Sequence, residues 1–170
     1  MTIQTIIQLF ADGAVIPIIL IAGYALLFLV PKGHRFAAYS RILIAGITAY
    51  LLAKLLAAVY QPAAERPFEI LGVKPGALYL PNAGFPSDHA LFTTFLTLAV
   101  WFETRRRGIS ITLAILTVCV CIGRVLALVH TPLDVIGGVV VASMGALWYL
   151  QADRKHIVPG SRKKHKKIVH

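Results

Sequence analysis

Long apolar runs make up most of the chain, and short polar segments separate them. A helix needs roughly 20 apolar residues to cross the hydrocarbon core of a bilayer. The runs predict membrane-spanning helices at about residues 14–30, 42–60, 88–103, 109–129 and 132–150. The apolar part of the third run, Ala90 to Phe102, is so short that a buried core helix would explain it equally well.

The N-terminal segment carries a different pattern. Residues 3–10 place their isoleucines and phenylalanine on one face of a helix and their glutamines elsewhere. This pattern predicts a short amphipathic helix that lies in the membrane interface and is ended by Asp12-Gly13. We therefore expect an all-α fold, an integral membrane helical bundle with about five transmembrane helices plus this N-terminal amphipathic helix.

Composition supports a membrane protein, because 58% of the 170 residues are hydrophobic and the mean hydropathy is +0.76. We predict one membrane-embedded domain over residues 1–150, followed by a basic tail over residues 151–170. The net charge of +10 is compatible with nucleic-acid binding, but the tail has no interleaved aromatic residues. Its position after a membrane span instead indicates a cytoplasmic anchor that faces anionic lipid headgroups.

Most basic residues lie in three groups, at residues 32–41, at residues 105–107 and in the tail. Five spans put these groups on the same side of the membrane, which the positive-inside rule identifies as cytoplasmic. The N-terminus and the loop at residues 61–86 then lie outside. The predicted localisation is the cell inner (plasma) membrane, with a multi-pass topology.

The loop at residues 61–86 contains five of the nine prolines. A stiff loop of this length in a small protein is usually either functional or disordered. Its aromatic residues Phe68, Tyr79 and Phe85 favour an ordered segment at the interface. In the last span, small residues between positions 137 and 145 predict close helix packing, within or between protomers.

Arg124 is unusual because it lies within a predicted span. An arginine at a span centre costs about 2.5–3.5 kcal/mol even on the lenient insertion scale, so it should face the bundle interior or an aqueous pocket. The alternative is that Arg124 snorkels to the outer interface. His130 and Asp134 follow it in the chain. Thr131 and Asp134 also fit a capping box, which would give Asp134 a structural role.

A second polar cluster, Pro86-Ser87-Asp88-His89, opens the third span. Ser87 is a good N-cap and Asp88 suits the positive end of a helix dipole, so both have structural explanations. A helix N-terminus also offers free N–H groups to an anion such as phosphate, and His89 is not needed for capping. The predicted topology gathers five polar residues at outer helix ends: Arg66, His89, Arg124, His130 and Asp134.

These residues resemble the signature of the type 2 phosphatidic acid phosphatase superfamily, lipid phosphatases that share their active site with vanadium haloperoxidases. That signature consists of a Lys before Arg-Pro, a Pro-Ser-Gly-His, and a Ser-Arg followed by His and then Asp. The corresponding segments here are Glu65-Arg66-Pro67-Phe68, Phe85-Pro86-Ser87-Asp88-His89, and Gly123-Arg124 with His130 and Asp134. The matching region covers roughly residues 54–134.

Three positions depart from that signature. The family lysine lies seven residues before the motif arginine, where this chain has Val59, and Lys54 is the candidate replacement. Gly123 replaces the usual serine, which removes one hydroxyl donor. Asp88 replaces the usual glycine, and this form is similar to the bacitracin-resistance type of undecaprenyl-diphosphate phosphatase. Beside a polyanion, the Asp88 carboxylate must pair with a cation, bear a proton or point away.

The resemblance implies a mechanism in which His130 attacks phosphorus and carries a phosphohistidine, Asp134 orients the imidazole, and His89 protonates the leaving group. The implied phosphate-binding residues are Arg66, Arg124, Ser87, Asp88 through its backbone amide, and Lys54. No metal or other cofactor is expected, because the carboxylates do not cluster and the arginines supply positive charge.

An outward-facing site at the interface suits a lipid whose headgroup carries the phosphate. The expected substrate is undecaprenyl diphosphate, hydrolysed to undecaprenyl phosphate, with phosphatidylglycerophosphate or phosphatidate as the alternative. A non-catalytic membrane protein that binds anionic lipids through its basic tail is a second alternative. No nucleic-acid partner is expected.

Overall fold

The structure is a computed structural model that describes residues 2–61, 65–82 and 84–150, and within these ranges it contains helices and no strand. The helices are α1 (Ile3–Gln8), η1 (Leu9–Gly13), α2 (Val15–Tyr24), η2 (Ala25–Leu29), η3 (Lys32–His34), α3 (Arg35–Val59), α4 (Pro67–Ile70), α5 (Asp88–Thr104), α6 (Arg107–Leu126) and α7 (Pro132–Gly145). Of these, η1 and η2 are π-helical and η3 is a 3₁₀ turn. The predicted basic tail lies outside the described residues.

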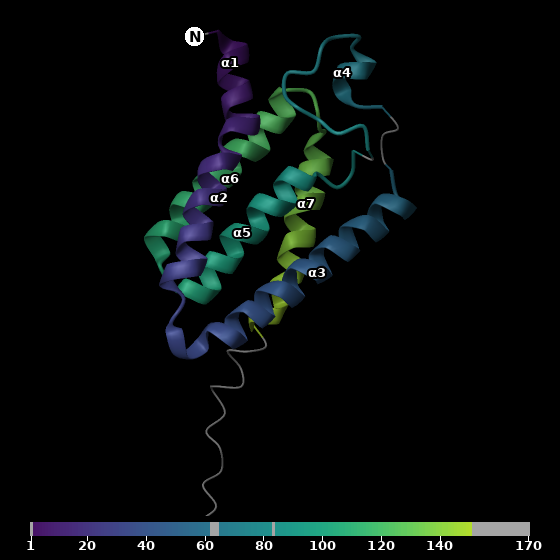
Figure 1. The fold of residues 1–170 in the computed structure, drawn as a ribbon. Coiled ribbons are helices and arrows are strands. Elements are labelled where there is room, and N and C mark those ends of the chain that lie inside the picture. The colour runs from purple at the N-terminus through teal and green to yellow at the C-terminus, as the bar shows by residue number, and fades with distance from the viewer. Residues whose placement is uncertain (1, 62–64, 83, 151–170) are drawn as a thin grey trace, which may run out of the picture.

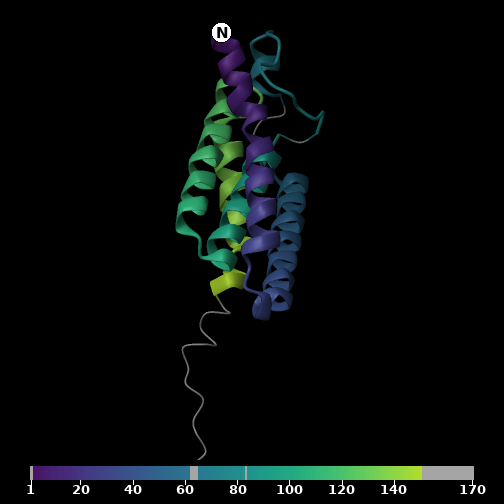
Figure 2. The same cartoon turned by 60° about the vertical axis from the view of Figure 1, so that its left-hand side comes forward.

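The predicted helical membrane bundle is confirmed. Four helical stretches are long and apolar enough to cross a bilayer: Ile3–Leu29, Lys32–Val59, Arg107–Leu126 and Pro132–Leu150. The remaining predicted span, the third, corresponds to α5, whose 17 residues lie inside the bundle and pack most extensively against α6 and α7 (Figures 1 and 2). Its central position explains why its apolar segment is as short as that of a buried core helix.

The N-terminal helix α1 is present, but the predicted end at Asp12-Gly13 is wrong. The chain continues through the π-helical turn η1, in which the Ala14 N–H donates to the Leu9 carbonyl at 2.8 Å. Residues Ile3–Leu29 therefore form one helical stretch, and α1 continues in the direction of α2 (Figure 1). Asp12 does not end the helix because other parts of the bundle bind its carboxylate, as described below.

The two ends of the bundle differ in chemistry. The α2–α3 and α5–α6 connections lie together at one end, while the loop that contains α4 lies at the other (Figure 1). At the first end, Arg41 of α3 donates two hydrogen bonds to Glu103 of α5, at 2.7 and 2.6 Å. The basic groups at residues 32–41 and 105–107 are thus brought to the same end, as the charge pattern predicts.

Small residues allow α7 to approach its neighbours closely. A Cβ on Gly145 would lie 2.6 Å from the Ala45 carbonyl oxygen of α3, and a Cβ on Gly138 would lie 2.6 Å from the Ser87 carbonyl oxygen. These distances are too short for any side chain larger than hydrogen. The small residues of the last span therefore pack within the protomer, against α3 and the start of α5.

Candidate active site

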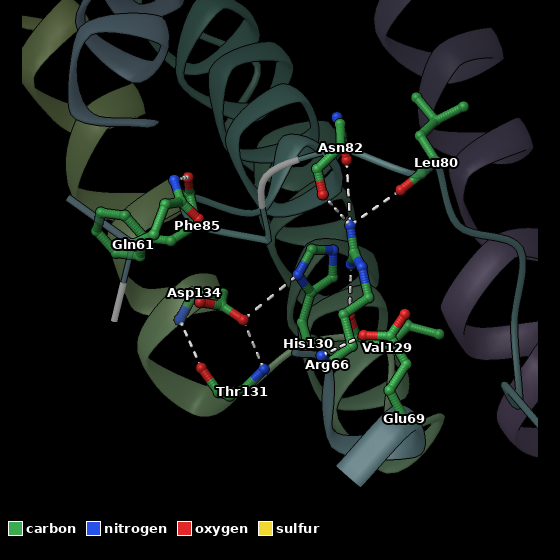
Figure 3. Close-up of polar contacts among 10 residues, drawn as sticks. All are labelled: Gln61, Arg66, Glu69, Leu80, Asn82, Phe85, Val129, His130, Thr131 and Asp134. Atoms are coloured by element: carbon green, nitrogen blue, oxygen red, sulfur yellow. Dashed lines mark hydrogen bonds and ion pairs between the residues drawn. The ribbon is translucent and has the colours of Figure 1, made fainter. Parts of the chain in front are cut away.

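Arg66 binds the long loop to the rest of the bundle. Its Nη1 donates to the Val129 carbonyl at 2.6 Å, and its Nη2 donates to the Leu80 carbonyl at 3.0 Å (Figure 3). Nη2 also lies within hydrogen-bond distance of the backbone oxygen and Oδ1 of Asn82, at 3.2 and 3.1 Å. The Glu69 carboxylate accepts from the Arg66 backbone N–H at 2.6 Å and caps α4. The described part of the loop is therefore ordered around one guanidinium group.

The start of α5 presents Ser87, Asp88 and His89. Ser87 occupies the N-cap position, yet its side chain makes no capping hydrogen bond. Its hydroxyl is buried and has no hydrogen-bond partner among the described residues. Its backbone N–H instead donates to the Asp134 carbonyl at 2.9 Å. The structural explanation for Ser87 as a capping side chain is therefore wrong, and its hydroxyl is available to another acceptor or donor.

Asp134 combines a structural contact with a contact to His130 (Figure 3). The predicted capping box is present: the Thr131 hydroxyl accepts from the Asp134 N–H at 3.2 Å, and Asp134 Oδ2 accepts from the Thr131 N–H at 2.7 Å. The same Oδ2 lies 3.6 Å from Nδ1 of His130. That distance is too long for a hydrogen bond but close enough for electrostatic attraction. One capped carboxylate thus holds Nδ1 of His130 toward α7 and leaves Nε2 on the opposite side of the ring.

His130 lies between α6 and α7 and is buried. The pKa of His130 lies below the ordinary value for a histidine, mainly because the imidazole is buried. The positive charges of Arg124 and Arg66 lower this pKa further. The Asp134 carboxylate opposes this shift. The net effect favours the neutral imidazole, which is the form that has a lone pair for nucleophilic attack.

Arg124 is the largest fully buried side chain among the described residues, with 1% of its side chain exposed. Its Nη1 donates to Oδ1 of Asp12 at 2.8 Å and to the Leu78 carbonyl at 2.7 Å. The expectation that it faces the bundle interior is met, and it does not snorkel. Sequence reasoning missed Asp12, although a single carboxylate within an apolar stretch is a signal that a buried cation needs it.

These elements converge on one small pocket at the loop end of the bundle. The residues that line it are Arg66, Leu80, Asn82, Asp88, His89, Arg124 and His130. Five of the eight predicted site residues therefore meet there. Of the other three, Asp134 contacts Nδ1 of His130, and Lys54 contacts Asp88 from α3. The Ser87 side chain is buried at the start of α5 and is not part of the lining.

The sequence profile of the PAP2 superfamily matches residues 35–157. The chain belongs to the PAP2 superfamily. Members of this family are phosphatases, so the chain is assigned to the phosphoric ester hydrolases that act on lipid phosphates. The match includes every predicted site residue, whereas Asp12 lies before it. No curated protein and no solved structure matches the chain.

A polar chain links Lys54 and Asp88, which belong to two of the three departures of this PAP2 protein from the family signature. Lys54 Nζ lies 3.6 Å from Oδ1 of Asp88, and the Asn82 side-chain amide donates to Oδ2 of Asp88 at 3.2 Å. Asn82 in turn accepts from Arg66. The sequence requires the Asp88 carboxylate to pair with a cation, bear a proton or point away from the phosphate. It is paired with a cation, Lys54. Lys54 contacts the lining residue Asp88 but does not itself line the pocket, so its contact with phosphate stays a prediction.

Positive charge in the PAP2 pocket comes from Arg66 and Arg124. Among the described residues no group of three or more histidine, cysteine, aspartate or glutamate side chains could hold a metal ion. Guanidinium groups match the geometry of phosphate oxygens, which suits them to neutralise a phosphoryl group. The arrangement provides a cationic pocket with two imidazoles, one of which is oriented by a carboxylate.

Proposed function

We propose that this PAP2 protein is a membrane lipid phosphatase that hydrolyses undecaprenyl diphosphate to undecaprenyl phosphate through a phosphohistidine intermediate. The observation that carries this proposal is the convergence of His89, His130, Arg66 and Arg124 on one small pocket. Two imidazoles and two guanidinium groups from separate segments are the groups that metal-independent phosphoryl transfer uses.

In the first step, Nε2 of His130 attacks the terminal phosphorus. A P–N bond forms, the bond to the bridging oxygen breaks, and His89 gives its proton to the leaving lipid phosphate. The contact of Asp134 with Nδ1 supports this role, because it directs Nε2 away from α7 and stabilises the positive charge that develops on the ring.

In the second step, His89 takes a proton from water, and the resulting hydroxide attacks the phosphohistidine. The P–N bond breaks, and inorganic phosphate leaves with neutral His130 restored. In both steps Arg66, Arg124, the Ser87 hydroxyl and the amide of Asp88 bind the equatorial oxygens, where negative charge accumulates. The unpartnered Ser87 hydroxyl supports its inclusion among these ligands.

A lipid substrate fits the surroundings of the pocket. An apolar groove between α3 and α5 is lined by Ile42, Leu43, Gly46, Ile47, Tyr50, Leu51 and Phe95. At one end of this groove, Nζ of Lys54 lies over the Tyr50 ring, 5.3 Å from the ring centroid. The same Lys54 contacts Asp88. A lipid hydrocarbon chain bound in this groove would therefore extend toward the polar pocket. We assign the pocket to the extracytoplasmic side of the inner membrane and the basic tail to the cytoplasm, by the positive-inside rule.

A diphosphate headgroup suits the Lys54–Asp88 pair better than a monophosphate does. The second phosphate adds negative charge near the mouth of the pocket. The Lys54 side chain is 46% exposed, so its ammonium group can leave the Asp88 carboxylate and bind phosphate oxygens instead. Phosphatidylglycerophosphate and phosphatidate carry a terminal phosphate on a glycerol and are the alternative substrates.

The test is phosphate release by purified protein supplied separately with undecaprenyl diphosphate, phosphatidylglycerophosphate and phosphatidate in excess chelator. The His130→Ala variant should lose turnover by at least about a thousandfold, because it lacks the nucleophile. His34→Ala, which removes an exposed histidine at the opposite end of the bundle, is the matched control and should keep it.

Release of phosphate from none of the three lipids would refute the enzyme proposal and leave a membrane protein that binds anionic lipids. Faster release from a glycerol-based lipid than from the diphosphate would refute the substrate assignment alone.

A further inference from the structure

Within the described part of the chain, Arg124 forms hydrogen bonds through only one of its three side-chain nitrogens. Both hydrogens of Nη1 are used, one by Asp12 and one by the Leu78 carbonyl. Nε is buried without a hydrogen-bond partner, and Nη2 makes no hydrogen bond to any described residue. The edge formed by Nε and Nη2 is the edge with which arginine grips two oxygens of a phosphate. Since Arg124 lines the pocket, this edge is the part of the side chain left for a ligand.

The three groups around Nη1 form a closed set of hydrogen bonds. Asp12 Oδ1 accepts from Arg124, Asp12 Oδ2 accepts from the Leu78 N–H at 2.9 Å, and the Leu78 carbonyl accepts from Arg124. Two acceptors on one nitrogen fix the rotation of the planar guanidinium group as well as its position. The arrangement therefore sets the direction in which the Nε–Nη2 edge faces.

Two backbone features bring Asp12 to this place. The π-helical turn η1 contains Asp12, and such turns insert one extra residue that changes the direction of the side chains around it. Gly123, the residue before Arg124, lets η1 lie directly against α6: a Cβ there would be 2.5 Å from the backbone nitrogen of Ala11. The helix that carries Asp12 thus contacts α6 backbone to backbone, one residue from Arg124.

We propose that Asp12 is a positioning residue for phosphoryl transfer, which holds Arg124 by Nη1 so that its Nε–Nη2 edge binds the transferred phosphoryl group. The inference rests on the proposed function. It goes beyond the family, because Asp12 precedes the matched region and Gly123 stands where the family signature has serine. Asp12 does not contact the substrate. Its carboxylate neutralises the buried cation and keeps the guanidinium plane fixed before the ligand arrives.

The experiment compares Asp12→Ala, Asp12→Asn and the control Glu65→Gln in the full chain, using the best lipid substrate and orthovanadate as a competitive inhibitor. Asp12→Ala should lower kcat/KM roughly 10- to 100-fold, the loss expected from a misplaced binding group. The vanadate inhibition constant should rise by a similar factor. Asp12→Asn keeps an oxygen that accepts from Nη1 and should recover most of that loss. Glu65→Gln removes an exposed carboxylate and should stay within about twofold of wild type.

A purely structural role for Asp12 would give a different result. Partial misfolding lowers the amount of active protein and hence the apparent kcat, but it does not change an inhibition constant. A second measurement repeats Asp12→Ala in an Arg124→Lys background. If Asp12 acts through Arg124, the further loss there should be less than about threefold, because the two effects are not additive.

The proposal is overturned if Asp12→Ala leaves the vanadate inhibition constant at the wild-type value, or if its losses add fully to those of Arg124→Lys. If Asp12→Ala does not fold, Asp12→Leu, which also lacks an acceptor for Nη1, takes its place, and an unchanged vanadate constant or fully additive losses in Asp12→Leu/Arg124→Lys overturn it. Failure of the wild-type protein to hydrolyse any lipid phosphate contradicts the proposed function instead, so the two failures are distinguishable.

Discussion

Gly123→Ala should separate η1 from α6 and weaken the Asp12–Arg124 contact without changing either charged residue. The new Cβ would lie 2.5 Å from the Ala11 nitrogen, 2.8 Å from the Phe10 carbonyl carbon and 2.9 Å from the Ala11 Cα. All three atoms belong to the backbone, so no side-chain rotation relieves the overlap. Ordinary contact begins about 1 Å further out, and η1 must retreat by roughly that distance.

The expected cost follows from this displacement. Overpacking of a well-packed interior typically destabilises by about 1–3 kcal/mol, and the upper part of this range applies where backbone must move. A retreat of about 1 Å also stretches the 2.8 Å Asp12–Arg124 hydrogen bond beyond bonding distance. We therefore expect a fall in unfolding free energy of about 2–3 kcal/mol and a fall in kcat/KM on the order of tenfold or more.

The assay combines thermal unfolding in detergent with phosphate release from the lipid substrate. Gly108→Ala is the matched control, because Gly108 lies on the same helix and a Cβ there meets nothing within 4 Å. Alanine in a helix is favoured over glycine by roughly 0.5–1 kcal/mol, so this control should be neutral or slightly stabilising. If Gly123→Ala has the same unfolding temperature and the same rate of phosphate release as Gly108→Ala, the close contact between η1 and α6 does not exist and the prediction is refuted.

Two further predictions concern the protonation of His130 and the opposite end of the bundle. The acid limb of the pH profile of kcat/KM should lie below the ordinary histidine pKa near 6.5, because burial lowers the pKa of His130 and the attacking imidazole must be neutral. In Asp134→Asn the limb should move lower still, because the carboxylate that raises this pKa is gone; a limb at or above 6.5 in both proteins would contradict this. Arg41→Ala should lower the unfolding free energy by roughly 3 kcal/mol, since it leaves the buried Glu103 carboxylate without its paired guanidinium. The unfolding free energy of Arg41→Met/Glu103→Leu, measured by denaturation, should return most of the way to the wild-type value. Equal unfolding free energies of the single and double variants would exclude a strong ion pair.

The sequence predicted those features that depend on local pattern or on charge balance. The capping box of Thr131 and Asp134 is a four-residue signal, and it is present with both hydrogen bonds. The grouping of basic residues at one end follows from the number of spans. By contrast, hydropathy located the apolar part of each span but not the helix ends: α3 begins at Arg35, about two turns before the predicted 42, because its first residues lie outside the apolar run.

Contacts between distant residues could not be predicted in this way. Asp12 and Arg124 are separated by 112 positions, and nothing local marks them as partners. Asp12-Gly13 looked like a helix end because both residues favour one, and tertiary contacts with Leu78 and Arg124 overrode that preference. Asn82 was missed for the same reason, since its role depends on Arg66 and Asp88 meeting across the loop.

The two arginines of the pocket are not equivalent, and the difference bears on how phosphate binds. Nη2 of Arg66 already donates to the Leu80 carbonyl and to Asn82, and Nη1 donates to the Val129 carbonyl, so only single N–H groups on Nε and Nη1 are left for a ligand unless the loop releases Nη2. Arg124 keeps a two-nitrogen edge unbound because Asp12 and Leu78 both accept from the same Nη1. A buried cation with an unbound edge binds two oxygens of an anion without first breaking a protein hydrogen bond, whereas Arg66 must release Nη2 from the loop to do the same. Arg124 therefore supplies the larger net gain on phosphate binding, and the residues that keep its edge unbound matter as much as the residues that line the pocket.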